Sequence, residues 1–373
     1  MAARRRRSAW PALGLALLAS TSLACKPSEP EPSSERAPEP APGEAPERSA
    51  AEAAELVRAD GTIFAETELM GTRVSINVWV GSDGDPLAAS QAITDAMAEI
   101  ARLEAIASEW QATSDLTRVN RSNGEAVEVP PELLEILAHA QTISADTEGL
   151  FDVSFYAVGQ LWSFRPGAKP PSPEAIAAEL PKVDWRAIEL DETRKTVTLT
   201  RPGMKIGLGA IAKGYAVDAA SDLLVARGFT NHIVEAGGDT RVRGRKGDKT
   251  WKVGVQDPKQ TVGRIGYLTA VDEAVVTSGN YARFFVWEGV HYTHILDPRT
   301  GWPIPADETP KSVTLVASNA TDADAYCTAV SVMDPERGLA FVEARPGLEA
   351  IIIGPDDVVH VSSGLGERFV EGG

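Results

Sequence analysis

The stretch KIGLGAIAKGYAVD, residues 205–218, combines small residues, one lysine and the start of a helical pattern. Small residues let a backbone approach a ligand closely, and a helix N-terminus together with Lys213 attracts phosphate. The segment GLGAIA imitates a dinucleotide-binding fingerprint, but the chain lacks the repeated β-α-β pattern and the acidic residue about 20 positions further on that such a site needs. A P-loop is excluded because Gly214 follows the lysine. The alternative to a phosphate site is a glycine turn that serves packing alone.

Asp324 and Thr328, in NATDADAYCTAV, are four residues apart in a helical pattern. At this spacing their side-chain oxygens lie on one face of the helix. A carboxylate and a hydroxyl suit a hard cation such as Mg2+, which takes few protein ligands and keeps several waters. A solvated helix face is the alternative. Any metal must be held by oxygen or histidine, because Cys25 and Cys327 are the only cysteines in the sequence.

A third stretch, THILDPRTGWP at residues 293–303, contains one of only five histidines, His294. Its prolines and its glycine make it too irregular for a helix or a central strand. Asp-Pro and Thr-Gly are common in turns, so a plain turn is one interpretation and a functional loop is the other. Two further glycine-containing stretches, around Gly237-Gly238 and around Gly279, are predicted as hairpin turns.

The elements that must position these stretches are strands and helices in irregular order. Alternating polar and apolar residues predict a strand pair over 64–80, and apolar residues at helical spacing predict a helix over 86–108. This order favours an α+β fold over a doubly wound sheet. The other expected elements are a helix after Pro131, short strands over 185–206, a helix over 212–227 that ends at Gly228, strands over 233–296, a strand over 313–317 and a helix over 320–333.

The N-terminus indicates secretion rather than fold. In residues 1–24 four arginines precede an apolar segment, and small residues precede Cys25. This pattern is typical of a signal peptide of the bacterial lipoprotein kind, with Cys25 lipidated after cleavage; cleavage that leaves a free cysteine is the alternative. Residues 25–60 are rich in Pro, Glu and Ala and are predicted to form a disordered tether. Residues 61–373 are long enough for one large folded domain.

The formal net charge of −17, from 36 basic and 53 acidic residues, argues against a nucleic-acid partner. Phosphate backbones are bound through basic surfaces. Two cysteines also provide no disulfide framework, although the expected compartment allows one.

Eight motifs follow one another along the chain: MGT, SEWQATSDLTRVN, GLFDVSFYAVGQLW, GLGAIAKGYAVD, EAGGD, TSGNYARFF, THILDPRTGWP and DADAYCTA. In this order they give the chain a close resemblance to the ApbE-like FAD:protein FMN transferases, which include flavin transferase lipoproteins. The resemblance covers about residues 64–343 and implies a single large α+β domain of ApbE type, T-fold-like, with an FAD cleft.

The resemblance implies Mg2+-dependent transfer of FMN from FAD to a Ser or Thr hydroxyl of an acceptor protein, with release of AMP. It assigns His294 to the transferred phosphate, where its imidazole, with a pKa expected near the working pH, takes the acceptor proton. The metal ligands would be the carbonyl of Ala210, Asp324 and Thr328. Residues assigned to FAD are Met70, Trp110, Phe151, Asp152, Val153, Lys213 and Ile295.

Gly207 departs from the family pattern, which commonly has an aspartate there that contacts the flavin nucleotide. Two alternatives therefore stay open beside the transferase: an FAD pyrophosphatase that gives FMN and AMP, and a non-catalytic flavin-binding lipoprotein. The acceptor is expected to be a redox protein of the membrane or the extracytoplasmic space. The protein itself is expected in the bacterial cell envelope, lipid-anchored at the periplasmic or extracytoplasmic face. Self-modification is not expected, because DPRTGWP lacks the Ala-Thr ending of an acceptor site.

Overall fold

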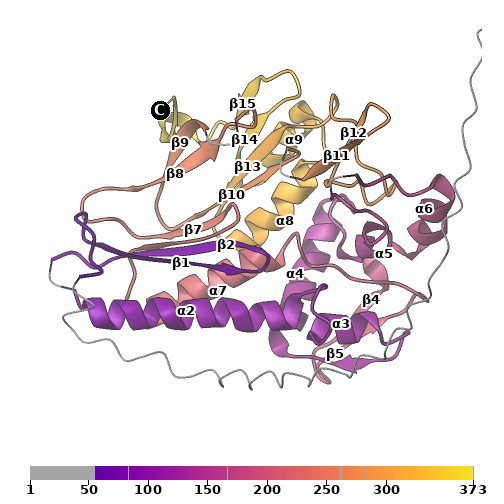
Figure 1. Ribbon diagram of the computed structural model, residues 1–373, viewed down its shortest axis with the longest axis horizontal. Helices are drawn as coiled ribbons and strands as arrows, with labels where there is room; N and C mark the ends of the chain where they lie inside the picture. The colour runs from indigo at the N-terminus through magenta and orange to yellow at the C-terminus, as the bar shows by residue number, and fades with distance from the viewer. Residues whose placement is uncertain (1–54, 83, 166, 261–262, 282, 373) are drawn as a thin grey trace, which may run out of the picture. The chain divides into compact units, whose positions relative to one another are not determined.

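The computed structural model describes residues 55–82, 84–165, 167–260, 263–281 and 283–372 (Figure 1). The predicted signal peptide, Cys25 and residues 26–54 of the expected tether lie outside the described residues. Within the described part, no helix is both long and apolar enough to cross a membrane. The folded chain begins before the expected boundary at residue 61. Val57 packs against the main core, and the Asp60 carboxylate accepts a hydrogen bond from the Thr62 hydroxyl at 2.6 Å.

An eight-stranded sheet forms the centre of the fold (Figure 1). Each neighbouring pair of its strands is antiparallel, which confirms the α+β class and explains why GLGAIA does not belong to a dinucleotide-binding β-α-β unit. In their order across the sheet the strands are β1 (Thr62–Leu69), β2 (Thr72–Trp79), β6 (His232–Ala236), β7 (Asp239–Arg243), β10 (Ala274–Gly279), β13 (Ser312–Ala317), β14 (Glu349–Ile353) and β15 (Val359–Val361).

The predicted strand pair over 64–80 is confirmed as β1 and β2. Ile76 and Val78 are buried, and the residues next to them are partly exposed, as alternation along a half-buried strand requires. Met70 and Gly71 join the strands in left-handed backbone conformations, with φ of 53° and 69°. This conformation is costly for a residue with a side chain, and tertiary contacts compensate: the Met70 N–H donates to Glu104 Oε2 at 2.9 Å.

Three helices cover one face of the sheet: α2 (Pro86–Ala107), α7 (Ala212–Ala226) and α8 (Ala320–Val330) (Figure 1). The sequence predicts all three within a few residues. The α2 helix begins at Asp85, whose side chain accepts hydrogen bonds from two backbone N–H groups of the first turn. The α7 helix ends just before Gly228, which has a φ of 89°.

A smaller sheet covers the other face and consists of β8 (Trp251–Gln256), β9 (Arg264–Ala270) and β16 (Phe369–Glu371). The central strands contribute to both cores because successive side chains point to opposite faces. Val276 belongs to the core under the helices, whereas its neighbour Val275 packs with Trp251 and Leu268 of the smaller sheet.

Most of the remaining elements lie on the right-hand side of Figure 1. Two lie elsewhere: the helix at Pro335–Glu343 packs on β14, and the 3-10 turn at Gly366–Arg368 lies against β9. A hairpin packs its buried Phe285 against Trp162 in a separate aromatic cluster. These elements are α3 (Asp115–Asn120), β3 (Val127–Glu128), α4 (Pro131–Asp146), α5 (Tyr156–Gly159), α6 (Pro173–Glu179), β4 (Ile188–Asp191), β5 (Thr196–Leu199), hairpin β11 (Phe284–Trp287) with β12 (Val290–Thr293), α9 (Pro335–Glu343), and short 3-10 turns at Val153–Phe155, Leu180–Lys182, Trp185–Ala187 and Gly366–Arg368.

Two expectations about local structure were wrong in part. Gly279 does not form a hairpin turn; it is the last residue of β10, and a Cβ atom there would lie 2.2 Å from Cε1 of Tyr281. The strands expected over 185–206 occupy only β4 and β5, and residues 200–206 follow as irregular chain. The prediction failed at Gly279 because glycine is favoured for two different reasons. It is favoured at turns with a positive φ, and also where a ring, here that of Tyr281, packs directly against the backbone.

Candidate active site

Lys213 and Asp324 meet where α7 and α8 cross. Gly214 lies so close to α8 that a Cβ atom there would be 2.2 Å from the Ala320 carbonyl oxygen. The Lys213 ammonium lies 3.2 Å from Asp324 Oδ2, and the Gly214 N–H donates to the same oxygen at 3.3 Å. The bare glycine therefore lets the two helices approach until a lysine and an aspartate more than 100 residues apart form an ion pair.

Asp239, which the sequence does not single out, is the third member of this cluster. The β6–β7 hairpin turns at Gly237 and Gly238, whose φ values of 57° and 102° are in the range that glycine adopts most easily. This turn places Asp239 at the start of β7 with Oδ2 2.8 Å from Lys213 Nζ. The Asp239 and Asp324 side chains are each only 3% exposed. Three separate motifs thus converge on one buried cluster.

Two buried carboxylates facing one ammonium leave the cluster short of positive charge. Burial, with the adjacent Asp324 carboxylate, raises the pKa of Asp239 well above its usual value despite the attraction of Lys213. Burial lowers the pKa of Lys213, but the two carboxylates outweigh burial and raise it, so the lysine stays charged. Asp239 Oδ2 has no hydrogen-bond donor of good geometry among the described residues. A further cation would balance these charges.

The oxygen groups on α8 and in the loop before α7 are of the kind that fits Mg2+. Asp324 and Thr328 stand one turn apart on α8, the first buried and the second half-buried, and Ala210 lies in the loop that leads into α7. The described residues hold no group of three or more His, Cys, Asp or Glu side chains arranged for a metal. The candidate ligands are therefore a carboxylate, a hydroxyl and a backbone carbonyl. All three bind through oxygen, which is the ligand atom that Mg2+ prefers.

The Asp218 carboxylate fixes the register of α7 against α8. It accepts hydrogen bonds from the Ala320 N–H at 3.0 Å, and from the N–H and hydroxyl of Thr321, both at 2.8 Å. These groups form the first turn of α8. Because one side chain of α7 satisfies them, the two helices cannot slide and Lys213 keeps its place beside Asp324.

His294 follows directly on β12 and is oriented by Arg283. Its backbone N–H donates to the Arg283 carbonyl oxygen at 3.0 Å, and its Nδ1 lies 3.2 Å from the same oxygen. A carbonyl only accepts, so Nδ1 carries the proton and Nε2 keeps a lone pair. Burial, assisted by the charges of Arg283 and Lys213, lowers the pKa of His294 to about 4.

The pKa expected for His294, near neutral pH, is therefore wrong for the protein alone. The imidazole is neutral at neutral pH and free to accept a proton at Nε2. The adjoining segment is also a tight turn, in which the Gly301 N–H donates to the Asp297 carbonyl oxygen at 2.8 Å. The turn interpretation of the stretch is therefore confirmed for residues 297–301, which begin three residues after the histidine. The functional role of His294 stays a prediction.

The glycine loop before α7 faces Tyr156 and Glu109. A Cβ atom at Gly207 would lie 3.0 Å from the Cβ, Cγ and Cδ2 atoms of Tyr156, so the aromatic ring occupies the space of a side chain there. Burial raises the pKa of Glu109, while backbone hydrogen bonds at Leu208 and Gly209 and the charge of Lys213 act in the opposite direction. Where the family commonly has an aspartate, this chain therefore has a glycine next to the Tyr156 ring, with the Glu109 carboxylate close to the same loop.

The residues expected to contact FAD differ in exposure. Trp110 is 80% exposed and meets the Tyr156 ring edge-on, with the centroids 6.2 Å apart. Phe151, Asp152 and Val153 are buried. Asp152 accepts hydrogen bonds from the backbone N–H groups of Ser154 and Trp185, at 2.8 and 3.1 Å, so its carboxylate holds the local chain. The Trp110 side chain has the most surface available to a ligand. Met70 and Ile295 are half-buried and pack on the main core.

The antiparallel sheet with its covering helices and the buried cluster of Lys213, Asp239 and Asp324 define the class of protein to which the chain is compared. The chain belongs to the ApbE family, whose family model matches residues 70–352.

Similar proteins come from several bacteria. The FAD:protein FMN transferase of Treponema pallidum is 36% identical over 272 residues, covering 68% of this chain and 75% of the relative. The one of Vibrio cholerae is 32% identical over 260 residues, covering 67% and 75%. Among solved structures, the ApbE protein of Thermotoga maritima superposes with a TM-score of 0.74 at 32% identity, covering 83% of this chain and all of that one. The apo flavinyl transferase ApbE of Pseudomonas stutzeri gives 0.73 at 27%, covering 84% and 98%.

Proposed function

We propose that this protein transfers FMN from FAD to a Ser or Thr hydroxyl of an acceptor protein, in a Mg2+-dependent reaction that releases AMP. The names of the relatives support the transferase class. The single observation that carries the finer proposal is the buried cluster of Lys213, Asp239 and Asp324, in which two carboxylates face one ammonium. The low pKa of His294, which the charge of Lys213 helps to lower, supports a proton-accepting imidazole.

The reaction exchanges one phosphorus–oxygen bond for another. The acceptor hydroxyl oxygen attacks the phosphorus of the FMN half, a phosphoester bond forms, and the bond to the bridging oxygen breaks so that AMP leaves. Such a transfer depends on positioning and charge neutralisation more than on covalent help from the protein. Mg2+ held by Ala210, Asp324 and Thr328 would neutralise charge on the phosphate oxygens.

The chain's own residues supply the other parts. His294 Nε2 accepts the proton of the acceptor hydroxyl, since Nδ1 is engaged with the Arg283 carbonyl. The diphosphate of FAD brings negative charge, which opposes the effect of Lys213 and raises the pKa of His294 from about 4 toward the working pH. Lys213 orients the phosphate as a point charge from the first turn of α7. Trp110 offers an exposed aromatic face to a planar ring of FAD.

We also propose that Cys25 carries a lipid and that the protein acts in the cell envelope, on a redox protein acceptor. The signal pattern of residues 1–24 and the composition of residues 25–60 support this location. Detergent phase partitioning of the wild type and of Cys25→Ala tests the anchor; equal partitioning into water would contradict it.

The activity is tested by incubating the protein with FAD, Mg2+ and a candidate acceptor, then separating the nucleotides. Release of AMP with FMN bound to the acceptor supports the transferase. Free FMN in an amount equal to AMP would instead support the pyrophosphatase, and unchanged FAD would support binding without catalysis.

A further inference from the structure

The side-chain amide of Asn120 holds Ile206 as a strand neighbour would. Asn120 Nδ2 donates to the Ile206 carbonyl oxygen at 2.8 Å, and the Ile206 N–H donates to Asn120 Oδ1 at 2.7 Å. The two residues are 86 positions apart, Asn120 at the end of α3 and Ile206 at the start of the glycine loop. Both hydrogen-bonding groups of one backbone position are therefore satisfied by one side chain.

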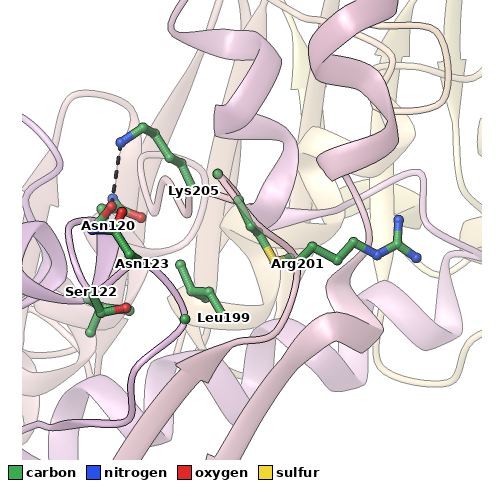
Figure 2. A pocket seen from close by; sticks show the side chains of 10 residues that line it. Asn120, Ser122, Asn123, Leu199, Arg201 and Lys205 are labelled. Atoms are coloured by element: carbon green, nitrogen blue, oxygen red, sulfur yellow. Dashed lines mark hydrogen bonds between the residues drawn. The ribbon is translucent and has the colours of Figure 1, made fainter.

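Asn120 also lines a small cavity behind the loop (Figure 2). Figure 2 shows Lys205, the residue before Ile206, across from Asn120, with its ammonium 3.5 Å from the Asn120 carbonyl oxygen. The Ile206 side chain itself is fully buried in the main core. The amide contact therefore adds to side-chain packing and fixes the backbone groups of Ile206.

The next residues of the loop are held one after another up to α7. The Gly207 N–H donates to the Val153 carbonyl oxygen at 2.9 Å. Hydrogen bonds at Leu208 and Gly209 favour the ionised form of the Glu109 carboxylate. The N–H groups of Ile211 and Ala212 then donate to the Leu208 carbonyl oxygen at 3.0 and 2.8 Å, which starts the helix.

This continuous set of bonds matters because the apolar side chains of the loop alternate with small residues. Ile206, Leu208 and Ile211 are fully buried in the main core, whereas Gly207, Gly209 and Ala210 offer little to pack. Glycine leaves a segment with more backbone freedom than any other residue, so GLGAIA needs outside contacts to adopt one conformation. Near its end the loop contains Ala210, the candidate carbonyl ligand, and it leads into the first turn of α7, which contains Lys213. A small displacement at its start would therefore be passed to both groups.

We propose that Asn120 is a positioning residue: by pairing with Ile206 it fixes the glycine loop so that the Ala210 carbonyl and Lys213 face Asp324. This proposal rests on the proposed function for its effect on catalysis, but not for its effect on the loop. Asn120 touches neither substrate nor metal in this role and acts through the backbone of residues 206–212.

The test compares Asn120→Ala and Asn120→Asp with Asn231→Ala. Asn231 is a matched control, because it is also half-buried and its Oδ1 accepts a loop N–H, that of Arg245, at 2.9 Å. Hydrogen exchange of the amides in residues 206–212 is measured without FAD or metal. Melting temperature, the Mg2+ concentration for half-maximal activity, and FAD affinity are measured on the same preparations.

Loss of two hydrogen bonds predicts at least about tenfold faster exchange of the loop amides in Asn120→Ala, with a similar rise in the Mg2+ requirement. Asn231→Ala should change neither. Asn120→Asp is isosteric and keeps only the acceptor for the Ile206 N–H, so faster exchange is expected there too, even if the alanine variant does not fold.

Loop exchange and Mg2+ requirement equal to those of Asn231→Ala, in either Asn120 variant, would overturn the proposal. A uniform rise in exchange over the whole chain would also overturn it, because it would show a general role in stability. If the wild type transfers no FMN but the Asn120 variants still show faster exchange in the loop, the positioning role of Asn120 is supported and the proposed function is contradicted.

Discussion

Neutralising the one cation of the buried cluster, with Lys213→Met, should destabilise the fold unless a metal replaces it. The ammonium lies 2.8 Å from one carboxylate oxygen and 3.2 Å from the other, and its side chain is 24% exposed. At an effective dielectric constant of about 20, these two attractions sum to about 11 kcal/mol. Several kcal/mol of this loss are offset, because the variant no longer carries the desolvation cost of a buried ammonium. Protonation of Asp239 reduces the remaining loss of stability further. We expect a net loss of about 3–5 kcal/mol, the usual cost of leaving buried charge unpaired.

The assay is urea denaturation in EDTA and in saturating Mg2+. A ligand at 100 times its dissociation constant adds about 2.7 kcal/mol of stability, and Lys213→Met should gain more than the wild type because the metal supplies the missing charge. Asp239→Asn is the matched control. It leaves a one-to-one pair between Lys213 and Asp324, so its stability in EDTA should stay within about 1 kcal/mol of the wild type. Equal stability of Lys213→Met and wild type in EDTA, or a gap between them that Mg2+ does not narrow, would refute this account of the charges.

The remaining predictions concern the histidines and the helix contact. His294→Ala should lose about 10^2- to 10^4-fold in single-turnover transfer at nearly unchanged FAD affinity and melting temperature; a variant that keeps the rate would exclude the base. Burial lowers the pKa of His232 to about 4, below the unfolded value of about 6.5, so the unfolded state binds more protons between these values and stability falls as pH drops from 6.5 to 4. The fall should reach about 3 kcal/mol in pH-dependent denaturation, and His232→Gln should flatten it. Gly214→Ala places a Cβ atom 2.2 Å from the Ala320 carbonyl oxygen. It should lower the free energy of unfolding by about 1–3 kcal/mol or more and should also lower activity. Normal stability in thermal melts would show that α7 and α8 separate easily.

Local pattern was enough to predict the long elements. The helix α2 has an N-cap, an N1 proline and a regular apolar stripe, and in β2 alternation alone separates the buried side from the exposed one. Asp324 and Thr328 were also within reach of the sequence, because their relation depends only on the pitch of one helix.

The cluster itself could not be predicted, because it depends on contacts between distant segments. Asp239 follows Gly237-Gly238 as any strand residue follows a hairpin turn, and nothing local indicates that its carboxylate meets Lys213. One signal was available: an aspartate in a motif together with two glycines at a positive-φ turn. The low pKa of His294 is equally non-local, since burial and the charge of Lys213 cause it.

Intact mass of a candidate acceptor protein tests the central claim most directly. The acceptor is incubated with FAD and either wild type or Asp324→Ala, with Mg2+ or with EDTA. We expect the acceptor to gain the mass of one FMN, with one AMP released per FMN bound, only with the wild type in Mg2+. Lys213 keeps its ion pair with Asp239 when the Asp324 carboxylate is removed, so the variant should remain folded by circular dichroism. An acceptor that gains FMN from Asp324→Ala at the wild-type rate, or from the wild type equally well in EDTA, would contradict this claim.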